Sequence, residues 1–499
     1  MPLPASTQTH AADVIVIGGG FAGTWAALRA AETGASVILV DKAHVGRSGC
    51  STMTGGVTTA PFEGEDVSSW AEEFIRHGGY MCDQERTFRL LDLQRERVKD
   101  FVRWGVPIAR DEDGHIRRFM SRGMYNVRCL QFTPPVAMKI LRAQCEAAGV
   151  RILDRVFVDE LLTSDGEYPT RGAVCGAIGF HAREGTPVVL RAKQTIMATG
   201  PLSMKGTHIV DNDTGDGFSL AFRAGARIVD LEFGFGGTFS YLMKDHSIGG
   251  YNVALAHGAK LINAKGERFM AKYDPVRFER SELNRVVAAF VKEIIDGRGP
   301  VFLDFRDCDE SYFTGVSKVR TALDSRILLS GKVPDPRRFP LPIEPTWGLW
   351  NGTRSGVDND REGRSNVPGL LSAGSCSKNY ATGTHGSAGV PTAFCMTTGY
   401  TAGETAARDA SQMQLMETPR GRVEELIARM FEPLGRRSAG GVDEIHDALS
   451  MMETDVVETI VLDARKLQGF RDAARGALAR AEGAGAAEDR KITRLNSSH

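Results

Sequence analysis

The chain has 499 residues, 42% of them hydrophobic and 25% charged, with a formal net charge of -1. These values are typical of a globular protein of two or three domains. They exclude the strongly basic balance of nucleic-acid-binding proteins. No apolar run approaches the roughly 18 residues that predict a transmembrane helix, and residues 1–13 lack the apolar core of a signal peptide.

Cysteine usage indicates the redox compartment. The eight cysteines are scattered, and no two of them form a CxxC pair. This pattern argues against an iron–sulfur cluster or a structural zinc ion within this chain. The histidines show no metal-ligand spacing either, so no metal site is predicted. We expect reduced thiols and a cytoplasmic location.

Residues 12–42 predict a strand, a glycine-rich turn, a helix and a second strand. The turn contains Gly18, Gly20 and Gly23 in a GxGxxG pattern, and Asp41 ends the second strand. In this context the pattern is typical of dinucleotide binding. Gly20 would let a pyrophosphate approach the backbone at the helix N-terminus, and Asp41 would accept hydrogen bonds from ribose hydroxyls. A glycine turn without a ligand is the alternative.

The remaining elements follow in chain order. The sequence predicts a helix over 66–105, a helix near 134–148, strands within 150–162, 174–180 and 186–200 that form a β-meander returning to the main sheet, a strand within 366–374 and a helix over 389–407. The amino-acid composition changes from about residue 241 to 340, where the sequence is mixed and Arg-rich, and this change indicates an inserted domain. The last stretch, DRKITRLNSSH, fits none of these patterns and is interpreted as a non-native tail.

Three later motifs decide which dinucleotide is expected: TIMATG (195–200), NVPGLLSAG (366–374) and the helix over 389–407. With these the chain resembles the flavoprotein subunits of fumarate reductase and succinate dehydrogenase, a group that includes L-aspartate oxidase and the adenylylsulfate reductase α subunit. The resemblance covers nearly all of residues 12–470 and implies FAD.

The fold implied is α/β: a Rossmann-like FAD-binding domain with an inserted α+β capping domain and a C-terminal helical region. The expected boundaries are 12–240 and 341–410 for the two parts of the FAD-binding domain, 241–340 for the capping domain, 420–488 for the helical region and 489–499 for the tail.

The resemblance also implies the cofactor contacts. Asp216 stands where the family has an FAD-contacting acid, although a helix N-cap is an equal alternative. Ser375 replaces the acid that grips the ribityl chain, and Phe394 and Cys395 stand where the closing helix contacts the flavin ring. The expected cofactor-binding residues are Gly18, Gly20, Phe21, Ala22, Gly23, Asp41, Lys42, Ser48, Gly49, Cys50, Ser51, Thr52, Gly55, Gly56, Ala198, Thr199, Gly200, Asp216, Gly374, Ser375, Phe394 and Cys395.

The loop RSGCSTMTGG (47–56) corresponds to the segment that lies along the flavin in the family. Its hydroxyls would face the cofactor, and Gly55 and Gly56 would let the backbone pass beside the ring. The family histidine that bonds covalently to the flavin falls on Gly49. We therefore expect non-covalent FAD.

The substrate positions depart from the family. By alignment, the proton-shuttling arginine falls on Leu255 and a substrate-binding arginine on Gly389, and three further positions also differ. The remaining acid–base candidates are His257, His385 and Tyr251, each with an ordinary structural role as the alternative. Tyr241 and Arg128 are weaker candidates of the same kind. The pattern argues against a dicarboxylate enzyme.

These observations predict an FAD-dependent oxidoreductase that transfers hydride between a small organic substrate and flavin, by CH–CH dehydrogenation or reduction. One alternative is the flavin subunit of an electron-transfer complex resembling the adenylylsulfate reductase α subunit, with a separate iron–sulfur partner. A second is an amine oxidase resembling L-aspartate oxidase. A third is a non-catalytic FAD-binding protein.

Overall fold

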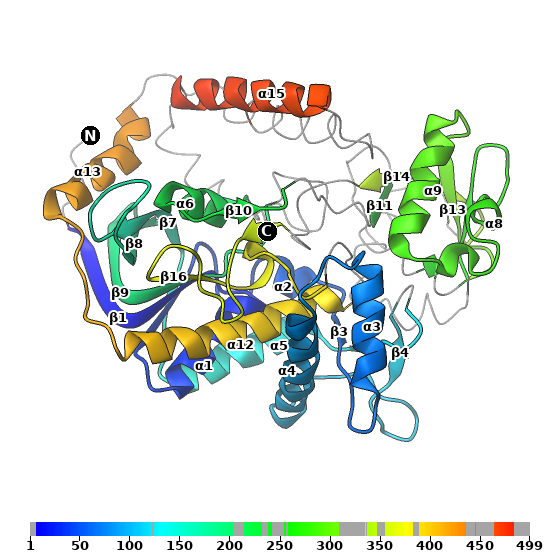
Figure 1. Ribbon diagram of the computed structural model, residues 1–499, viewed down its shortest axis with the longest axis horizontal. Helices are drawn as coiled ribbons and strands as arrows, with labels where there is room; N and C mark the ends of the chain where they lie inside the picture. Colours follow the sequence, from blue (N-terminus) through cyan, green and yellow to red (C-terminus); the bar gives the residue numbers. More distant parts are fainter. Residues whose placement is uncertain are drawn as a thin grey trace.

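The computed structural model (Figure 1) describes most of the chain. The described residues are 6–121, 124–202, 214–231, 238–241, 254–255, 258–308, 335, 337–346, 355–382, 389–435, 445 and 464–483.

A seven-stranded sheet forms the centre of the larger part of the molecule. Its strands run in the order β6-β2-β1-β9-β8-β7, and β16 also pairs with β9. Val14 to Val16 of β1 have no exposed surface, as expected for a strand covered on both faces. The strands are β1 (Gln8–Ile17), β2 (Val37–Asp41), β6 (Arg151–Asp154), β7 (Val156–Thr163), β8 (Val174–His181), β9 (Pro187–Met197) and β16 (Leu370–Ser372).

The meander predicted from the sequence is confirmed. β7, β8 and β9 pair antiparallel in succession, and β9 then pairs parallel with β1. On the other edge of β9, β8 pairs with the first half of the strand and β16 with Thr195 to Met197. The carboxyl ends of β1, β2, β9 and β16 therefore meet at one edge of the sheet, which is where open α/β sheets bind their ligands.

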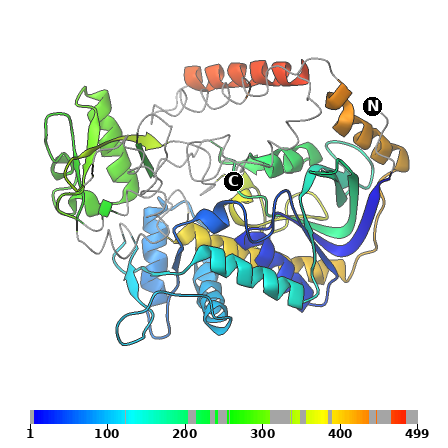
Figure 2. The ribbon, with the colours of Figure 1, turned by 180° about the vertical axis from the view of Figure 1, so that it is seen from behind.

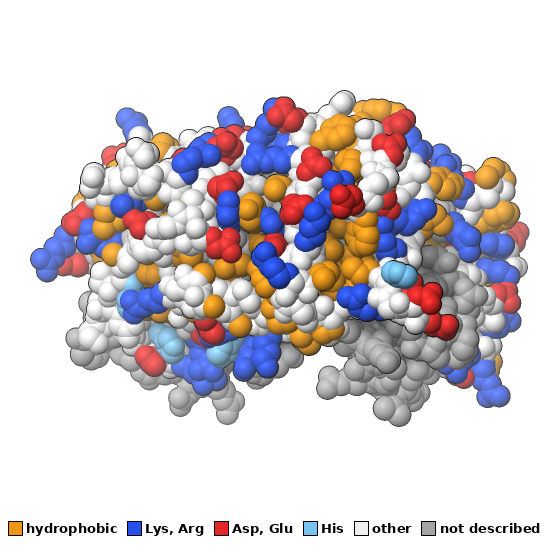
Figure 3. Space-filling view, turned by 90° about the horizontal axis from the view of Figure 1, so that it is seen from below, with side chains coloured by type: hydrophobic (Ala, Val, Ile, Leu, Met, Phe, Trp, Pro, Cys, Tyr) orange, Lys and Arg blue, Asp and Glu red, His pale blue; other side chains and the backbone are white. Residues whose placement is uncertain are grey.

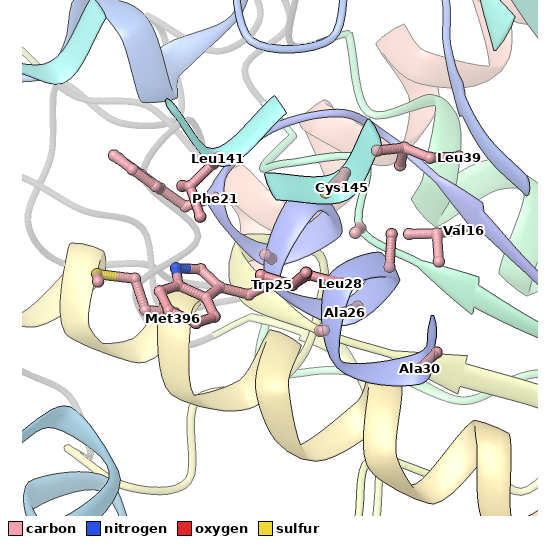
Figure 4. Packing of buried hydrophobic residues seen from close by; sticks show 14 of the residues in the cluster. Val16, Phe21, Trp25, Ala26, Leu28, Ala30, Leu39, Leu141, Cys145 and Met396 are labelled. Carbon is pink, nitrogen blue, oxygen red and sulfur yellow. The ribbon is translucent and has the colours of Figure 1, made fainter. Parts of the chain in front are cut away.

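Two helices cross on one face of this sheet at very short range. They are α1 (Phe21–Glu32) and α12 (Val390–Ala410). A Cβ atom at Gly399 would lie 2.2 Å from the carbonyl oxygen of Ala22, and one at Gly403 would lie 2.2 Å from that of Ala26. Only glycine permits this approach. Figure 4 shows Trp25 of α1 and Met396 of α12 in the apolar core beside the crossing.

The single helix predicted over 66–105 is wrong, because the structure has two helices there: α3 (Val67–His77) and α4 (Gln84–Arg103). The chain turns at Gly79 and Tyr80, both with positive φ. The carboxylate of Asp83 then caps α4 by accepting from the amides of Glu85 and Arg86, as Asp66 caps α3. The sequence contained signals of this turn in the adjacent Gly78 and Gly79 and in a second N-cap residue, Asp83.

The other elements of this part are shorter. The predicted helix near 134–148 is confirmed as α5 (Pro134–Ala147). Figure 2 shows the same arrangement from behind. The remaining elements are α2 (Cys50–Met53), β3 (Val57–Thr59), β4 (Arg118–Met120), β5 (Arg128–Gln131), α6 (Asp216–Ala224), β10 (Ile228–Val229), β15 (Gly356–Val357), η4 (Gly374–Cys376), α13 (Arg420–Phe431), η5 (Glu432–Gly435) and α15 (Ala464–Gly483).

A smaller unit lies to one side of this part (Figure 1) and has its own apolar cluster. Its sheet has the order β11-β14-β13-β12. Since β14 belongs to this sheet, the unit reaches Thr346, and the domain boundaries stay predictions. Its elements are β11 (Thr238–Tyr241), β12 (Lys260–Ile262), α8 (Met270–Tyr273), η2 (Phe278–Arg280), α9 (Leu283–Ile295), β13 (Val301–Asp304) and β14 (Leu341–Thr346).

The surface mixes side chains of all kinds. Figure 3 shows hydrophobic, basic and acidic side chains interspersed on the face seen from below. Among the described helices, none combines the length and the apolar character that crossing a bilayer requires.

Candidate functional site

A cavity of about 920 Å³, including its open mouth, lies at the edge of the sheet where β1, β2 and β9 end. We call it the sheet-edge cavity. It brings together most of the residues expected to bind the cofactor, although they are dispersed along the sequence. The expected residues that line it are Gly18, Gly20, Phe21, Ala22, Asp41, Lys42, Ser48, Gly49, Cys50, Ser51, Ala198, Thr199, Gly200, Asp216, Ser375 and Cys395.

Some lining residues were missed by the sequence analysis. Val156, Phe157 and Val158 line the cavity from the start of β7. Their apolar run predicted a strand but carried no signal that this strand would begin beside the glycine turn. Only the tertiary path of β7 places them there. The other missed lining residues are Ile17, Gly19, Val40, Pro201 and Leu220.

The glycine turn is shaped by close packing. Gly18 has φ +110°, and a Cβ atom on it would lie 2.3 Å from the carbonyl oxygen of Ala198. A Cβ atom on Gly23 would lie 1.7 Å from the carbonyl oxygen of Gly18. Gly23 therefore permits the close helix–strand contact, as its position in the pattern predicts.

The N-terminus of α1 faces the sheet-edge cavity. Its N-cap residue is Gly20, so no N-cap side chain occupies the first turn, and Gly20, Phe21 and Ala22 line the cavity. The amide of Phe21 donates to Ser51 Oγ at 2.9 Å. The partial positive charge of a helix N-terminus favours an anionic group at this place.

Asp41 is held in one orientation by the backbone. Its Oδ2 accepts from the amide of Gly19 and its Oδ1 from the amide of Ala43, both at 2.7 Å. Burial raises the pKa of this carboxyl group, and the two amide donors oppose that shift. A carboxylate fixed at the end of β2 can accept hydrogen bonds from ribose hydroxyl groups. The side of the cavity that contains Asp41 therefore suits a dinucleotide.

Lys42 and Asp216 join two walls of the cavity. Lys42 Nζ donates to Asp216 Oδ2 at 2.7 Å and to Thr214 Oγ1 at 3.0 Å. The N-cap alternative for Asp216 is wrong, because the N-cap of α6 is Gly215, with φ +71°. Asp216 is instead the first helical residue, and it lines the cavity.

The loop over residues 47–56 uses its hydroxyl groups within the protein. Ser48 Oγ donates to the carbonyl of His44 at 2.9 Å, and Thr52 Oγ1 donates to that of Gly49 at 3.0 Å. Ser51 Oγ accepts from α1, as described above. Ser48, Gly49, Cys50 and Ser51 line the cavity, whereas Thr52 is buried behind them.

Five other expected residues do not line the cavity: Gly23, Gly55, Gly56, Gly374 and Phe394. A Cβ atom on Gly56 would lie 2.1 Å from the carbonyl oxygen of Phe132, so packing against the end of β5 requires this glycine. Gly374 likewise packs against Ala22. Phe394 belongs to an apolar cluster with α3 and α4, on the other face of α12 from Cys395. Because successive residues of an α-helix point in different directions, these two sequence neighbours lie on different faces of α12.

The acid–base candidates His257, His385 and Tyr251 lie outside the described residues, as does the side chain of Tyr241. Arg128 lies in β5 and donates to the carbonyl of Tyr125, and it does not line the sheet-edge cavity.

Two positions of the expected substrate site are described. The side chain of Leu255 is 2% exposed and belongs to the apolar cluster of the smaller unit. Gly389 has φ +83°, and a Cβ atom on it would lie 2.8 Å from the backbone of Thr58. A cationic side chain cannot be accommodated at either position as it stands.

One group of possible metal ligands occurs among the described residues: Asp111, Asp113 and His115. All three are exposed on a loop before β4. Exposed acidic groups often cluster without an ion, so this group alone does not indicate a metal site.

Comparison with known proteins assigns the family. Residues 13–391 match the family described as FAD binding domain. A subunit of the CoM/CoB fumarate reductase of Methanothermobacter marburgensis is 30% identical over 467 residues, which cover 89% of this chain and 81% of the relative. L-aspartate oxidase of Streptomyces coelicolor is 30% identical over 400 residues, covering 77% of this chain and 66% of the relative.

Solved structures share the fold. Quinol fumarate reductase of E. coli superimposes with a TM-score of 0.85 at 21% identity, covering 98% of this chain and 86% of that one. Adenylylsulfate reductase of Archaeoglobus fulgidus gives a TM-score of 0.80 at 20% identity, covering 99% and 87%. The match to the FAD binding domain family and the 30% identical fumarate reductase subunit show that the chain belongs to the fumarate reductase and succinate dehydrogenase family of FAD-dependent oxidoreductases, and the solved structures show that it has the same fold.

Proposed function

We propose that the sheet-edge cavity holds FAD without a covalent bond and that the protein oxidises or reduces a CH–CH bond of a small organic substrate other than a C4 dicarboxylate. The observation that carries this proposal is a contrast within one chain. The dinucleotide wall is retained, with its glycine turn and its fixed Asp41, whereas Leu255 and Gly389 exclude the cations that a dicarboxylate would need.

The residues that would hold FAD follow from their placement. The N-terminus of α1, at Gly20 and Phe21, would bind the pyrophosphate. Asp41 would accept from the adenosine ribose, and Lys42 and Asp216 would hold the wall beside it. Ser375 and Cys395 would face the flavin half. Bound FAD supplies the two-electron redox chemistry, which these side chains do not possess.

The backbone at Gly49 supports non-covalent binding. Gly49 has φ +78° and ψ +177°, a region that is essentially restricted to glycine. A histidine at this position would strain the backbone, although the space around its Cβ is open. The loop conformation therefore disfavours the histidine that forms the flavin bond in the family. Acid precipitation of the yellow holoprotein tests this: colour in the supernatant is expected, and colour retained in the pellet would contradict it.

Substrate chemistry is limited by charge. A site for two carboxylates requires cationic side chains that the carboxylates can contact. A side chain buried among apolar groups does not offer such a contact. Leu255 can neither bind an anion nor transfer a proton, and Gly389 offers no side chain. A substrate with at most one carboxylate fits these positions better.

An anaerobic substrate panel tests the proposed reaction. Holoprotein is mixed with succinate, aspartate and a set of saturated non-dicarboxylate acids, alcohols and ketones, and loss of the visible flavin absorbance is recorded. We expect bleaching by a member of the last set and none by succinate. Free FAD with the same panel is the control. Rapid bleaching by succinate would overturn the proposed substrate class, and a failure to bind FAD after reconstitution would overturn the assignment of the cavity.

A second candidate is a flavin subunit that passes electrons to an iron–sulfur protein. Two similar proteins are subunits by name, one of the CoM/CoB fumarate reductase and one the flavoprotein of a Serratia fumarate reductase. Affinity purification from the native host followed by iron analysis would test it, since a stoichiometric iron–sulfur partner is expected only in this case.

The L-aspartate oxidase relative favours a third candidate, an amine oxidase. Hydrogen peroxide formed from amino acids under air would support it. We also propose a cytoplasmic location, which is supported by the thiol state of all eight cysteines. Localisation of a tagged full-length chain by fractionation tests this point.

A further inference from the structure

A second cavity, of about 490 Å³ including its open mouth, lies on the far side of α12 from the sheet-edge cavity. We call it the α4–α12 cavity. Its walls come from α4, from the segments 359–363 and 372–381, and from α12. Of the residues expected to contact the cofactor, Phe394 is the one that lines it. Neither the FAD wall nor the proposed reaction uses the other residues of this cavity.

The lining of the α4–α12 cavity is strongly cationic. Arg86, Arg89, Arg361 and Lys378 line it, against one carboxylate, that of Asp360. These four cations come from three separate segments of the chain, so the cluster exists only in the folded protein. Convergent cations in a concave site are typical of anion binding.

Two of these cations are recessed and share one aromatic ring. The Lys378 side chain is 7% exposed and that of Arg86 is 17% exposed. The guanidinium carbon of Arg86 lies 4.3 Å from the centre of the Tyr380 ring, and Lys378 Nζ lies 4.7 Å from it. Two cations at one ring repel each other, and the ring compensates only part of that repulsion.

Nearby acids compensate the charge unevenly. Asp83 pairs with both Arg361 and Arg86, the latter at 3.5 Å. Glu85 also pairs with Arg361, and Lys378 pairs with Asp230. Burial and the charge of Arg86 still lower the pKa of Lys378, and burial lowers the pKa of Arg86. A lowered pKa for a cation means that its charged form is under-compensated, which an added anion would relieve.

The α4–α12 cavity shares a wall with the FAD site. Ser372 lines the α4–α12 cavity and Ser375 lines the sheet-edge cavity, three residues further along the same segment. On α12, Thr398 lines the α4–α12 cavity and Cys395 lines the sheet-edge cavity. The amide of Gly374 donates to Thr398 Oγ1 at 2.9 Å, which ties the two elements of the wall together.

We propose that the α4–α12 cavity is a binding site for a small oxyanion, carboxylate or phosphate in chemistry, distinct from the substrate site and separated from FAD by one wall. Arg86 and Lys378 form its recessed end, and Arg89 and Arg361 lie at its mouth. The recessed lysine favours a small molecule over an acidic side chain of a partner protein, because the ligand must enter the cavity to reach it. Such a ligand would act on the flavin only through the shared wall.

Isothermal titration calorimetry on the oxidised holoprotein tests the proposal at low ionic strength, with inorganic phosphate and with malonate as probes. We expect saturable binding of at least one probe. Lys378→Met should weaken it at least tenfold. Arg89→Gln, a change at an exposed residue, should weaken it about threefold and guards against a folding defect in the first variant. Lys99→Gln, at a residue of the same helix that is 59% exposed and outside the cavity, should leave it unchanged.

A titration without saturable heat for either probe would overturn the proposal, as would equal affinities in the wild type and both cavity variants. The titration contains no substrate and measures no turnover. A failure here therefore leaves the proposed reaction intact, and a failed substrate panel leaves this site intact.

Discussion

The sheet-edge cavity and the smaller unit are built by opposite means. The cavity is defined by backbone: glycines at contact distances that exclude a Cβ atom, amides that hold Asp41, and a helix N-terminus. The smaller unit is defined by side chains, with an apolar cluster around Leu255 and buried acids paired with arginines.

This difference determines which positions tolerate substitution and which do not. A backbone cradle tolerates almost no substitution, because a methyl group already collides with a carbonyl. A side-chain site can be emptied of its charges by single replacements while its unit stays folded. A backbone cradle of this kind is therefore easier to recognise in a sequence than a site made of side chains.

The largest effect is expected for a substitution in the glycine turn of the sheet-edge cavity. Gly23→Ala places a Cβ atom 1.7 Å from the carbonyl oxygen of Gly18, so we expect loss of bound FAD and destabilisation by more than about 3 kcal/mol. Flavin absorbance per mole of protein and urea unfolding measure both. Gly421→Ala in α13, where a Cβ atom has open space, is the matched control and should be neutral or stabilising by up to about 1 kcal/mol. Normal FAD content in the Gly23 variant would contradict the requirement for glycine at this position.

Leu255→Arg tests the smaller unit, which is defined by its side chains. A buried, unpaired guanidinium in an apolar cluster should destabilise the protein by about 3 kcal/mol. It should not create fumarate reduction, since Gly389 still supplies no second cation. Thermal unfolding and a fumarate assay with a reduced dye report the two outcomes, with Leu255→Met as a control of similar volume. Gain of fumarate reductase activity would mean that one cation at this position is sufficient, and it would contradict the proposed substrate class.

Glu293 in the smaller unit gives a pH-dependent effect. Its carboxylate is 1% exposed, and hydrogen bonds from Arg298, Tyr273 and Asn263 lower its pKa to about 2. For a lowered carboxyl pKa, the stabilisation is present above the unfolded pKa of about 4.3 and is lost as the pH falls towards 2.

Glu293→Gln should therefore cost about 2 kcal/mol at pH 7, a figure that allows for screening of the partly exposed Arg298. The cost should shrink as the pH falls below about 4.3. Urea unfolding between pH 3 and 7 measures it, and Glu96→Gln, at an exposed pair on α4, is the control. A cost that does not vary with pH would contradict the assigned role of the carboxylate.

The smallest effect on stability is expected at Asp41, where function and stability diverge. Burial raises its pKa, so the ionised carboxylate is a cost to the apoprotein that is fully relieved only at low pH. Asp41→Asn should weaken FAD binding at least tenfold by losing charged acceptors, with less than about 1 kcal/mol change in apoprotein stability. Flavin fluorescence titration and urea unfolding of the apoprotein separate the two. A large loss of apoprotein stability would assign Asp41 a structural role.

Much of the FAD half could be predicted from the sequence, because its signals are local. The GxGxxG turn, the acid ending β2 and the strand–helix alternation each lie within a few residues. The helix predicted over 66–105 was wrong because the apolar spacing on either side of residues 78–83 outweighed the turn signals within them, which are Gly78, Gly79 and the N-cap residue Asp83.

The sequence by itself determined that this chain binds a dinucleotide, since the glycines of the turn permit a close backbone approach that no other residue allows. The resemblance in three later motifs indicated that this dinucleotide is FAD. Only the tertiary structure decided which side chains share a cavity. Phe394 and Cys395 are neighbours in sequence, yet helical phase sends them into different cavities. Arg86 and Lys378 are nearly 300 residues apart, yet the packing of α4 beside α12 brings both to one ring. Long-range packing sets such contacts, and no local pattern records them.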